Sequence, residues 1–348
     1  MPLLLDRSVS KMKKFTYKLS GVDIDRAARF KEGIKALARK SFGPEVIKGI
    51  GGFGSLYRFS KEKFQDPVLV SSADGVGTKL KVACLAGKHD TVGIDAVAMN
   101  VNDILCTGAR PLFFLDYIAY GRLPQRVLLD IVRGVNKGCI ESGCSLIGGE
   151  TAQMPGMYKE GEYDIAGFCV GVVERKNIID GSKIRAGDIV IGLESSGMHS
   201  NGYSLLRKVF SVSEQKRMSA ALLKPTRIYA KPVLDLLYAK LYTLNAIHGI
   251  SHITGGAFYD KIARILPSNV NVRINKSSWP VPKIFKLIQN KGNIADREMY
   301  HTFNMGIGMV LIAQQKAAKA IIGHLARSGI KSWVIGDVLK GRRKVEIT

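Results

Sequence analysis

The sequence contains no apolar run of bilayer length, and Leu3 to Leu5 near its start is too short for the core of a signal peptide. Cysteine is also scarce, with five in 348 residues, an odd set without the paired spacing of a zinc site. These two absences favour a cytoplasmic protein with reduced cysteines. We therefore expect neither a membrane segment nor a zinc centre.

Acidic residues are few: 29 Asp and Glu stand against 52 Lys and Arg, which gives a formal net charge of +23. Such a balance favours polyanionic partners. The basic residues, however, lie in short clusters without the interleaved aromatic residues of a single-strand binding surface. We therefore expect a phosphorylated small-molecule substrate and no dedicated nucleic-acid partner, with a basic nucleic-acid-binding protein as the alternative from another class.

The remaining composition, 46% hydrophobic and 23% charged residues, is typical of a folded protein long enough for two domains. Helical and strand patterns alternate along both halves, so the predicted fold class is α+β with two layered α/β domains. The clearest predicted strands lie at 68–70, 111–119, 188–193 and 332–339. The predicted organisation is a flexible arm at 1–20, an N-terminal domain at 21–174 and a C-terminal domain at 175–348.

One turn organises the N-terminal half. The apolar residues Val68 to Val70 predict a buried strand that runs into Asp74-Gly-Val-Gly-Thr-Lys79. Asp74 would hold a divalent cation at a loop, the two glycines allow close backbone approach to phosphate, and Lys79 offsets negative charge. The alternative is an ordinary turn whose Asp caps the next helix.

Two more glycine-rich stretches repeat this pattern. Gly49 to Ser55 is too dense in glycine for a helix and predicts a loop that wraps a phosphate, or else a mobile turn. Gly148-Gly-Glu-Thr151 follows a strand and includes an acid, and its alternative is a β-hairpin loop. Between these stretches, Asp116 interrupts an apolar strand and would need a partner if it is buried.

Polar residues also gather near two predicted helices. Ser195 to Tyr203 carries hydroxyls, His199, an amide and glycines before a helix, which predicts an anion cradle in which the histidine donates to phosphate or moves a proton. Its alternative is a structural histidine. Asp95, Asn100 and Asp103 provide oxygen donors near a strand-to-helix turn, which suits magnesium unless they cap the helix or face solvent.

Together these stretches resemble the phosphoribosylformylglycinamidine cyclo-ligase family, also called aminoimidazole ribonucleotide synthetases. Two positions depart from the family pattern: Gln153 replaces the usual Glu, which puts a role there as base or metal ligand in doubt, and Ala257 replaces a third glycine. The motifs that carry the resemblance cover nearly the whole chain: DGVGTK at 74–79, ND at 102–103, PLFFLDY at 111–117, GGET at 148–151, MPGMY at 154–158, SSG at 195–197, HSNGY at 199–203, HITGG at 252–256 and FNMG at 303–306.

The resemblance implies ATP-dependent ring closure of formylglycinamidine ribonucleotide to aminoimidazole ribonucleotide, with ATP and Mg²⁺ as cofactors. It also implies a homodimer in which the N-terminal sheets form a barrel, and a C-terminal sheet covered by helices. The implied site residues are Lys79, His199 and His252 as catalytic groups; Asp74, Asp95 and Asp103 as metal ligands; Gly51, Gly52, Gly54, Gly75, Val76, Gly77, Thr78, Gly148, Gly149, Glu150 and Thr151 at ATP and its phosphates; and Ser196, Gly197, Ser200, Asn201, Gly202, Thr254, Gly255 and Gly256 at the substrate.

Related ATP-dependent enzymes are the remaining alternatives. Selenophosphate synthetase, thiamin monophosphate kinase and a hydrogenase maturation factor share the ATP-binding scaffold that the resemblance implies. The first of these usually needs a reactive cysteine or selenocysteine near its N-terminus, whereas the first cysteine here is Cys84. The sequence leaves open which of the two histidines, His199 or His252, moves protons.

Overall fold

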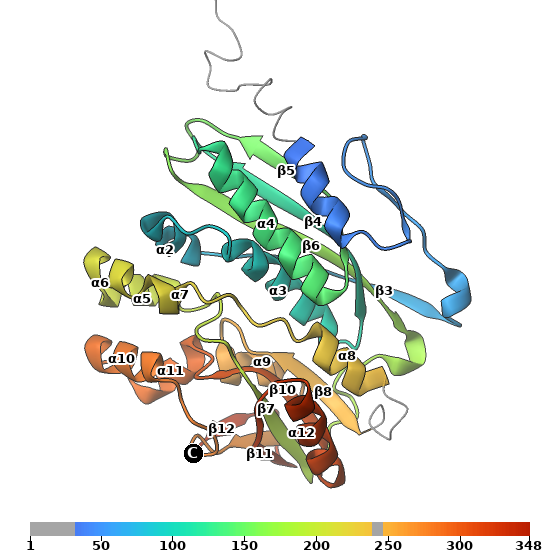
Figure 1. The fold of residues 1–348 in the computed structure, drawn as a ribbon. Helices are drawn as coiled ribbons and strands as arrows, with labels where there is room; N and C mark the ends of the chain where they lie inside the picture. Colours follow the sequence, from blue (N-terminus) through green and yellow to red (C-terminus); the bar gives the residue numbers. More distant parts are fainter. Residues whose placement is uncertain (1–31, 239–245) are drawn as a thin grey trace, which may run out of the picture.

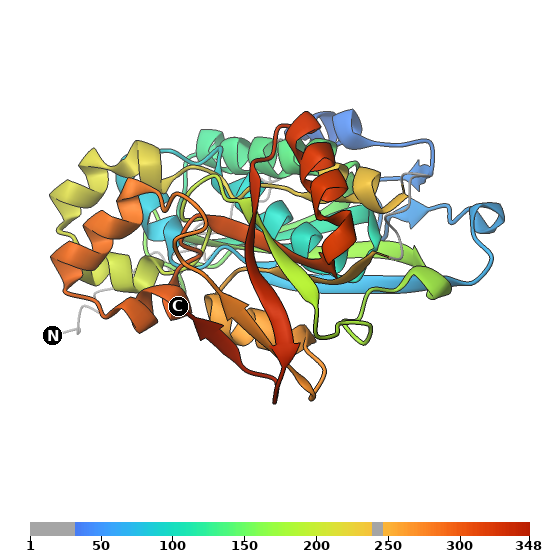
Figure 2. The ribbon, with the colours of Figure 1, turned by 90° about the horizontal axis from the view of Figure 1, so that it is seen from below.

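The computed structural model describes residues 32–238 and 246–348. In Figure 1 the N-terminal half of the described chain lies at the top and the C-terminal half at the bottom, and Figure 2 views the same layers from below. The arm predicted at 1–20 and the beginning of the first predicted helix lie outside the described residues, and a helix covers 32–38. Within the described ranges, no helix combines the length and the apolar character needed to cross a membrane.

The N-terminal half carries one main sheet and a small two-stranded ribbon. Its helices and strands are β1 (Val46–Lys48), β2 (Leu56–Tyr57), β3 (Pro67–Gly75), α2 (Lys79–Ala86), α3 (Val92–Leu105), β4 (Arg110–Tyr120), α4 (Gln125–Ser142), β5 (Ser145–Gln153) and β6 (Tyr163–Glu174). Short 3₁₀ turns lie at Arg39–Ser41, Lys61–Lys63 and Arg175–Asn177.

The main N-terminal sheet has the strand order β3-β6-β4-β5. Strand β6 pairs antiparallel with both β3 and β4, whereas β4 and β5 run parallel. Along β6 the buried residues Ile165 and Cys169 alternate with the exposed Phe168. Helix α3 packs on the buried face and against α4, as Figure 1 shows. The opposite face presents large apolar side chains to solvent.

The C-terminal half is richer in helices. Its elements are β7 (Asp188–Glu194), α5 (Tyr203–Val209), α6 (Val212–Arg217), α7 (Ser219–Leu222), α8 (Ala230–Tyr238), β8 (Ile247–His252), α9 (Ala257–Ile265), β9 (Val270–Ile274), α10 (Lys283–Gly292), α11 (Asp296–Thr302), β10 (Ile307–Gln314), a 3₁₀ turn (Gln315–Ala317), α12 (Ala318–Arg327), β11 (Ser332–Lys340) and β12 (Val345–Ile347).

The C-terminal sheet is mixed and has helices on both faces. Its strand order is β12-β9-β11-β7-β10-β8, with β12 parallel to β9 and the other neighbours antiparallel. Ile191 and Leu311 point to one face and pack in a cluster with Val233 of α8 and Leu325 of α12. On the other face, the buried Phe258 of α9 belongs to the main apolar core. The α+β class with helix-covered sheets is therefore confirmed.

Strand β4 confirms the strand predicted at 111–119, but two other expectations are wrong. Residues Val68 to Val70 lie in β3, which is an edge strand, so Leu69 is 63% exposed instead of buried. The glycines of Gly148–Thr151 lie inside β5, which pairs only with β4 in this sheet. Because β5 and β6 are not neighbours, the alternative of a β-hairpin loop is also wrong.

Candidate functional site

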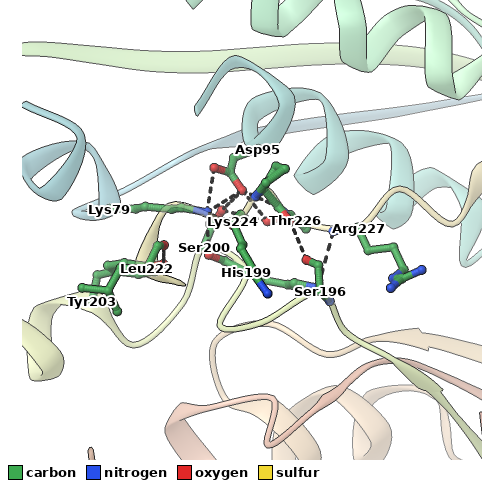
Figure 3. Close-up of polar contacts among 11 residues, drawn as sticks. Lys79, Asp95, Ser196, His199, Ser200, Tyr203, Leu222, Lys224, Thr226 and Arg227 are labelled. Carbon is green, nitrogen blue, oxygen red and sulfur yellow. Dashed lines mark hydrogen bonds and ion pairs between the residues drawn. The ribbon is translucent and has the colours of Figure 1, made fainter. Parts of the chain in front are cut away.

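A fully buried ion pair of the N-terminal half forms hydrogen bonds with the C-terminal half. The Lys79 side chain leaves the first residue of α2, and its Nζ lies 2.9 Å from Oδ1 and 2.8 Å from Oδ2 of Asp95 on α3. The same ammonium donates to the carbonyl oxygens of His199 at 3.0 Å and Lys224 at 2.7 Å (Figure 3). Burial lowers the pKa of Lys79, and the Asp95 carboxylate opposes that change.

The Asp95 carboxylate has further partners in the C-terminal half. Its Oδ1 accepts from the backbone N–H of Thr226 at 2.7 Å, the Thr226 hydroxyl at 2.7 Å and the Ser200 hydroxyl at 3.1 Å. Both charged side chains have no exposed surface. All three protons of the Lys79 ammonium therefore have protein acceptors, and Asp95 is enclosed by protein donors. This geometry argues against the predicted phosphate-facing role of Lys79 and the predicted metal role of Asp95.

The predicted catalytic residue His199 is also buried. Its Nε2 accepts from the backbone N–H of Ser196 at 3.2 Å and of Arg227 at 3.4 Å, which places its proton on Nδ1. Burial lowers the pKa of His199 well below its usual value, and the charges of His252, Lys79 and Arg227 act in the same direction. This contact set supports the structural alternative, in which neutral His199 joins the 195–200 loop to the segment after α7.

His252 has a different setting at the end of β8. Its Nδ1 lies 2.8 Å from Oδ1 of Asp103 on α3, and its Nε2 lies 3.4 Å from Nδ2 of Asn102. The His252 side chain is 2% exposed, whereas that of Asp103 is 42% exposed. The pair therefore connects a buried imidazole to a carboxylate that solvent and ligands can reach.

Asp74 lies near this pair at the end of β3. Burial raises the pKa of Asp74, the Gly75 N–H at 2.7 Å lowers it, and the negative charge of Asp103 raises it again. The structure thus brings Asp74, Asp103 and His252 together at the junction of the two halves, while Asp95 is held separately by Lys79. Among the described residues, no group of three or more His, Cys, Asp or Glu side chains forms a metal cluster.

The predicted ATP-binding stretch 75–78 follows Asp74 beside the start of α5. Val76 is 1% exposed, so only its backbone is available to a ligand. The hydroxyl of Thr78 lies 2.9 Å from that of Ser204. Gly75 and Gly77 leave this turn open to solvent at the same junction, although a side chain on Gly75 would approach the carbonyl oxygen of Ile165.

The predicted substrate residues lie in two neighbouring loops. The Ser200 hydroxyl donates to the Asp95 carboxylate, and the Ser196 hydroxyl donates to the carbonyl oxygen of Pro225. Asn201 lies next to Gly255, since a Cβ built on that glycine would be 3.4 Å from Asn201 Oδ1. The buried Nδ2 of Asn201 has no hydrogen-bond partner among the described residues. The remaining predictions in these loops, Gly197, Gly202, Thr254 and Gly256, stay predictions.

A cavity of about 1050 Å³ lies between the 50–55 loop and strands β4 and β5. It brings together seven predicted ATP-binding residues from segments about 100 residues apart: Gly51, Gly52, Gly54, Gly148, Gly149, Glu150 and Thr151. The 75–78 turn is not among the residues that line it. The predicted nucleotide-binding residues therefore form two groups, one in this cavity and one at the junction of the halves.

Several residues of the cavity and of the ion-pair network are not predicted as site residues from the sequence. The sequence identifies Asp116 only as an acid in need of a partner, and the structure places it in the wall of the cavity. Thr226 and Lys224 complete the buried ion-pair network from a segment without any glycine or histidine motif. The cavity aromatic residues Tyr57 and Phe113, whose ring centroids lie 5.3 Å apart, come from β2 and β4. Apart from Asp116, an acid within an apolar strand, no local signal in the sequence distinguishes these residues from ordinary core residues.

Both halves match one family type. Residues 61–173 match "AIR synthase related protein, N-terminal domain", and residues 185–348 match "AIR synthase related protein, C-terminal domain". The fold and the shared junction therefore define an AIR synthase related protein with one domain of each type.

Solved structures of this type share the fold. A hydrogenase maturation protein HypE in complex with ATP is 17% identical, with a TM-score of 0.68 over 94% of this chain and 92% of that one. Thiamine-monophosphate kinase from Stenotrophomonas maltophilia is also 17% identical, with a TM-score of 0.64 over 91% of this chain and 94% of that one. At such identities the likeness concerns the fold alone.

Much higher identities fix the family. A phosphoribosylformylglycinamidine cyclo-ligase of Pseudothermotoga lettingae is 53% identical over 342 residues, 96% of this chain and 99% of the relative. The corresponding enzyme of Carboxydothermus hydrogenoformans is 50% identical over 347 residues, 97% of this chain and 99% of the relative. The chain belongs to the phosphoribosylformylglycinamidine cyclo-ligase family.

Proposed function

We infer that the chain performs the reaction of its family, the ATP-dependent closure of formylglycinamidine ribonucleotide to aminoimidazole ribonucleotide in purine biosynthesis. The single observation that carries this inference is about 50% identity over nearly the whole length of cyclo-ligases. The test supplies formylglycinamidine ribonucleotide and ATP, and follows phosphate release together with aminoimidazole formation. Phosphate release without the aminoimidazole would contradict the inference and favour another kinase-like activity of this fold.

The chemistry has two steps. The formyl oxygen of the substrate attacks the γ-phosphorus of ATP and ADP leaves, which gives an imidoyl phosphate. A nitrogen of the amidine then attacks the imidoyl carbon, loses its proton, and inorganic phosphate leaves as the ring closes. Phosphorylation is needed because an amide oxygen is a poor leaving group, and the protein contributes chiefly by positioning the groups and stabilising charge.

We assign the proton transfer to His252. Its Nδ1 faces Asp103 at 2.8 Å, which orients the imidazole, and its Nε2 has one long contact, with Nδ2 of Asn102 at 3.4 Å, so we assign the basic role to Nε2. Both nitrogens of His199 are enclosed, because Nε2 receives two backbone N–H groups and the buried Nδ1 has no partner among the described residues. These contacts favour His252 over His199 in the choice that the sequence left open.

Magnesium would be held by Asp74 and Asp103. The negative charge of Asp103 raises the pKa of Asp74, so a cation between the two carboxylates would relieve their repulsion. Mg²⁺ commonly takes one or two carboxylates and completes its shell with water and substrate phosphates, where it neutralises phosphate charge. Two carboxylates, Asp74 and Asp103, are therefore enough protein ligands for Mg²⁺, and the proposal does not need Asp95, the third ligand that the sequence suggested.

Asp74→Asn is expected to raise the Mg²⁺ concentration for half-maximal activity by about 10- to 100-fold, because a neutral amide is a weaker ligand for a hard cation. The measurement is a Mg²⁺ titration of activity, with Mn²⁺ binding in the presence of ATP as an independent readout. Asp90→Asn, at an exposed ion pair with Lys88, is the matched control. An unchanged titration for Asp74→Asn would refute the assignment.

A homodimer is proposed from the exposed face of the N-terminal sheet. Leu69 on β3, Tyr117 on β4 and Phe168 on β6 are 63%, 43% and 40% exposed. The strand register places Leu115 opposite Phe168, and Tyr117 opposite Ala166, so these side chains share one face. Two such faces packed together would bury the apolar side chains and form the barrel that the family resemblance implies.

Phe168→Asp is expected to convert this dimer into a monomer, because it places a charge at the centre of the apolar face. Sedimentation velocity measures the change directly. Leu287→Asp, which alters another side chain that is 46% exposed but lies on α10, should leave the dimer intact. A wild-type chain that is monomeric and active would contradict the proposal.

The domain division and the location are proposed in the same way. We propose an N-terminal domain to residue 174 and a C-terminal domain from residue 175, since the last strand of one sheet ends at Glu174 and the first of the other begins at Asp188. We also propose that the enzyme works in the cytoplasm, where its phosphorylated substrate would be made.

The purified chain should show no salt-sensitive affinity for duplex DNA or RNA beyond that of any basic protein.

A further inference from the structure

Asp116 is a buried acid without a role in the two chemical steps of the reaction. It lies on β4, is 7% exposed, and belongs to the wall of the cavity of about 1050 Å³. Within the described ranges no hydrogen bond or ion pair joins its carboxyl group to another side chain. A buried carboxyl without such a partner is costly, and the cost is recovered when a ligand supplies the missing hydrogen bonds.

The backbone of β5 is shaped around this carboxyl group. Gly149 lies directly opposite Asp116 in the strand register and has a φ of +156°. A Cβ added to Gly149 would lie 2.0 Å from Oδ1 of Asp116. Only glycine therefore leaves the carboxyl group its position at the cavity wall.

The rest of the cavity offers apolar and polar surfaces. Its walls include the rings of Tyr57 and Phe113, which offer flat apolar surfaces, although the register of β4 places Phe113 on the face opposite Asp116. The glycine loop and Lys35, whose ammonium is paired with Glu32, also border a second hollow of about 420 Å³, whose lining adds Arg39 and Lys48. The cavity therefore has room and apolar surface for a planar ring with polar edges.

The protonation state of Asp116 allows its carboxyl group both to donate and to accept hydrogen bonds. Burial raises the pKa of Asp116 to about 7, with its own backbone N–H lowering it and the charge of Glu150 raising it. Near neutral pH the group therefore populates both forms, so it is able to accept one hydrogen bond and donate another. The edge of adenine offers the complementary pair, an amino N–H and a ring nitrogen with a lone pair.

We propose that the Asp116 carboxyl group is the specificity-determining contact for the purine base, and that it binds the amino edge of adenine. The inference rests on the proposed ATP-dependent function and adds the residue that selects the nucleotide. The amidine of the substrate has a similar N=C–NH₂ group. We favour adenine because aromatic rings and seven predicted ATP-binding residues line the same cavity as Asp116.

The test compares ATP with purine riboside triphosphate, which lacks only the 6-amino group. Calorimetry with Mg²⁺ measures the dissociation constant of each nucleotide for the full-length wild type, Asp116→Leu and Asp116→Asn. Asp130→Asn, on the exposed side of α4 in an ion pair with Arg133, is the control. We expect the wild type and the control to bind ATP about tenfold or more tightly than the analogue, and Asp116→Leu to bind both alike.

Asp116→Asn keeps an acceptor and a donor and should retain most of the preference, which covers the case in which the leucine variant fails to fold. A preference for ATP that survives in Asp116→Leu, or its absence from the wild type, would overturn the proposal. A weaker binding of formylglycinamidine ribonucleotide with unchanged ATP preference would also overturn it and assign the carboxyl group to the substrate amidine. Turnover is measured separately, so a chain that binds ATP selectively without forming product would refute the proposed function alone.

Discussion

Asp95→Ala is expected to lower the free energy of unfolding by about 3–5 kcal/mol, a large share of the stability of an ordinary domain. The substitution leaves the Lys79 ammonium buried without its counter-charge, and neither side chain has any exposed surface. It also removes the acceptor of the Thr226 and Ser200 hydroxyls and of the Thr226 N–H. Denaturation in urea, followed by circular dichroism, measures the change in midpoint.

An exposed ion pair provides the control. Lys231 and Asp235 on α8 lie 2.7 Å apart with side chains that are 77% and 49% exposed. Asp235→Ala is therefore expected to change stability by less than about 1 kcal/mol. Similar urea midpoints for the two variants would mean that solvent enters the Lys79–Asp95 contact and would contradict the structural assignment.

Asp95→Asn separates this structural role from the metal role that the sequence suggested. The amide keeps an oxygen for the Thr226 N–H but loses the charge, so stability should fall by less than in Asp95→Ala. The Mg²⁺ concentration for half-maximal activity should stay at the wild-type value. A strong increase in the Mg²⁺ requirement of a stably folded Asp95→Asn protein would restore Asp95 as a metal ligand.

The Asp74–Lys79 motif illustrates where sequence reasoning succeeds and where it ends. The spacing correctly indicates that the chain changes from strand to helix here, since β3 ends at Gly75 and α2 begins at Lys79. It cannot reveal which way Lys79 points, because that depends on acceptors 120 and 145 residues further along the chain. A lysine with its charge in the core looks the same in the sequence as one that faces a phosphate.

The cavity also shows which features of a site the sequence predicts and which it does not. Composition and glycine density were enough to select Gly51–Gly54 and Gly148–Thr151, which the fold brings to one cavity. Local patterns favoured a turn at 148–151, whereas the residues form part of a parallel strand whose partner, β4, precedes an intervening helix. Pairing across such a distance depends on packing of the whole domain, so the sequence alone did not specify it.

His252→Asn is expected to lower kcat by about 10²–10⁴-fold, the usual contribution of a positioned acid–base group. In the structure Nδ1 of His252 faces Asp103 at 2.8 Å, and Asp103 in turn lies close enough to Asp74 to raise its pKa. Loss of the imidazole would remove the basic nitrogen at this junction while the nucleotide cavity stays intact. The dissociation constant of ATP should therefore remain within about twofold of wild type, which separates a proton-transfer role from a binding role.

The same strand supplies a matched control for this experiment. His248 lies near the start of β8, is buried like His252, and places its Nδ1 2.7 Å from Oδ2 of Asp188. His248→Asn removes an equivalent buried histidine–carboxylate contact at a distance from Asp74 and Asp103, so it should reduce stability comparably but leave kcat of the folded protein near wild type. Equal losses of kcat in both variants would show that the effect comes from disruption of β8. A wild-type kcat in His252→Asn would exclude this residue as the proton acceptor and return the role to another group at the junction.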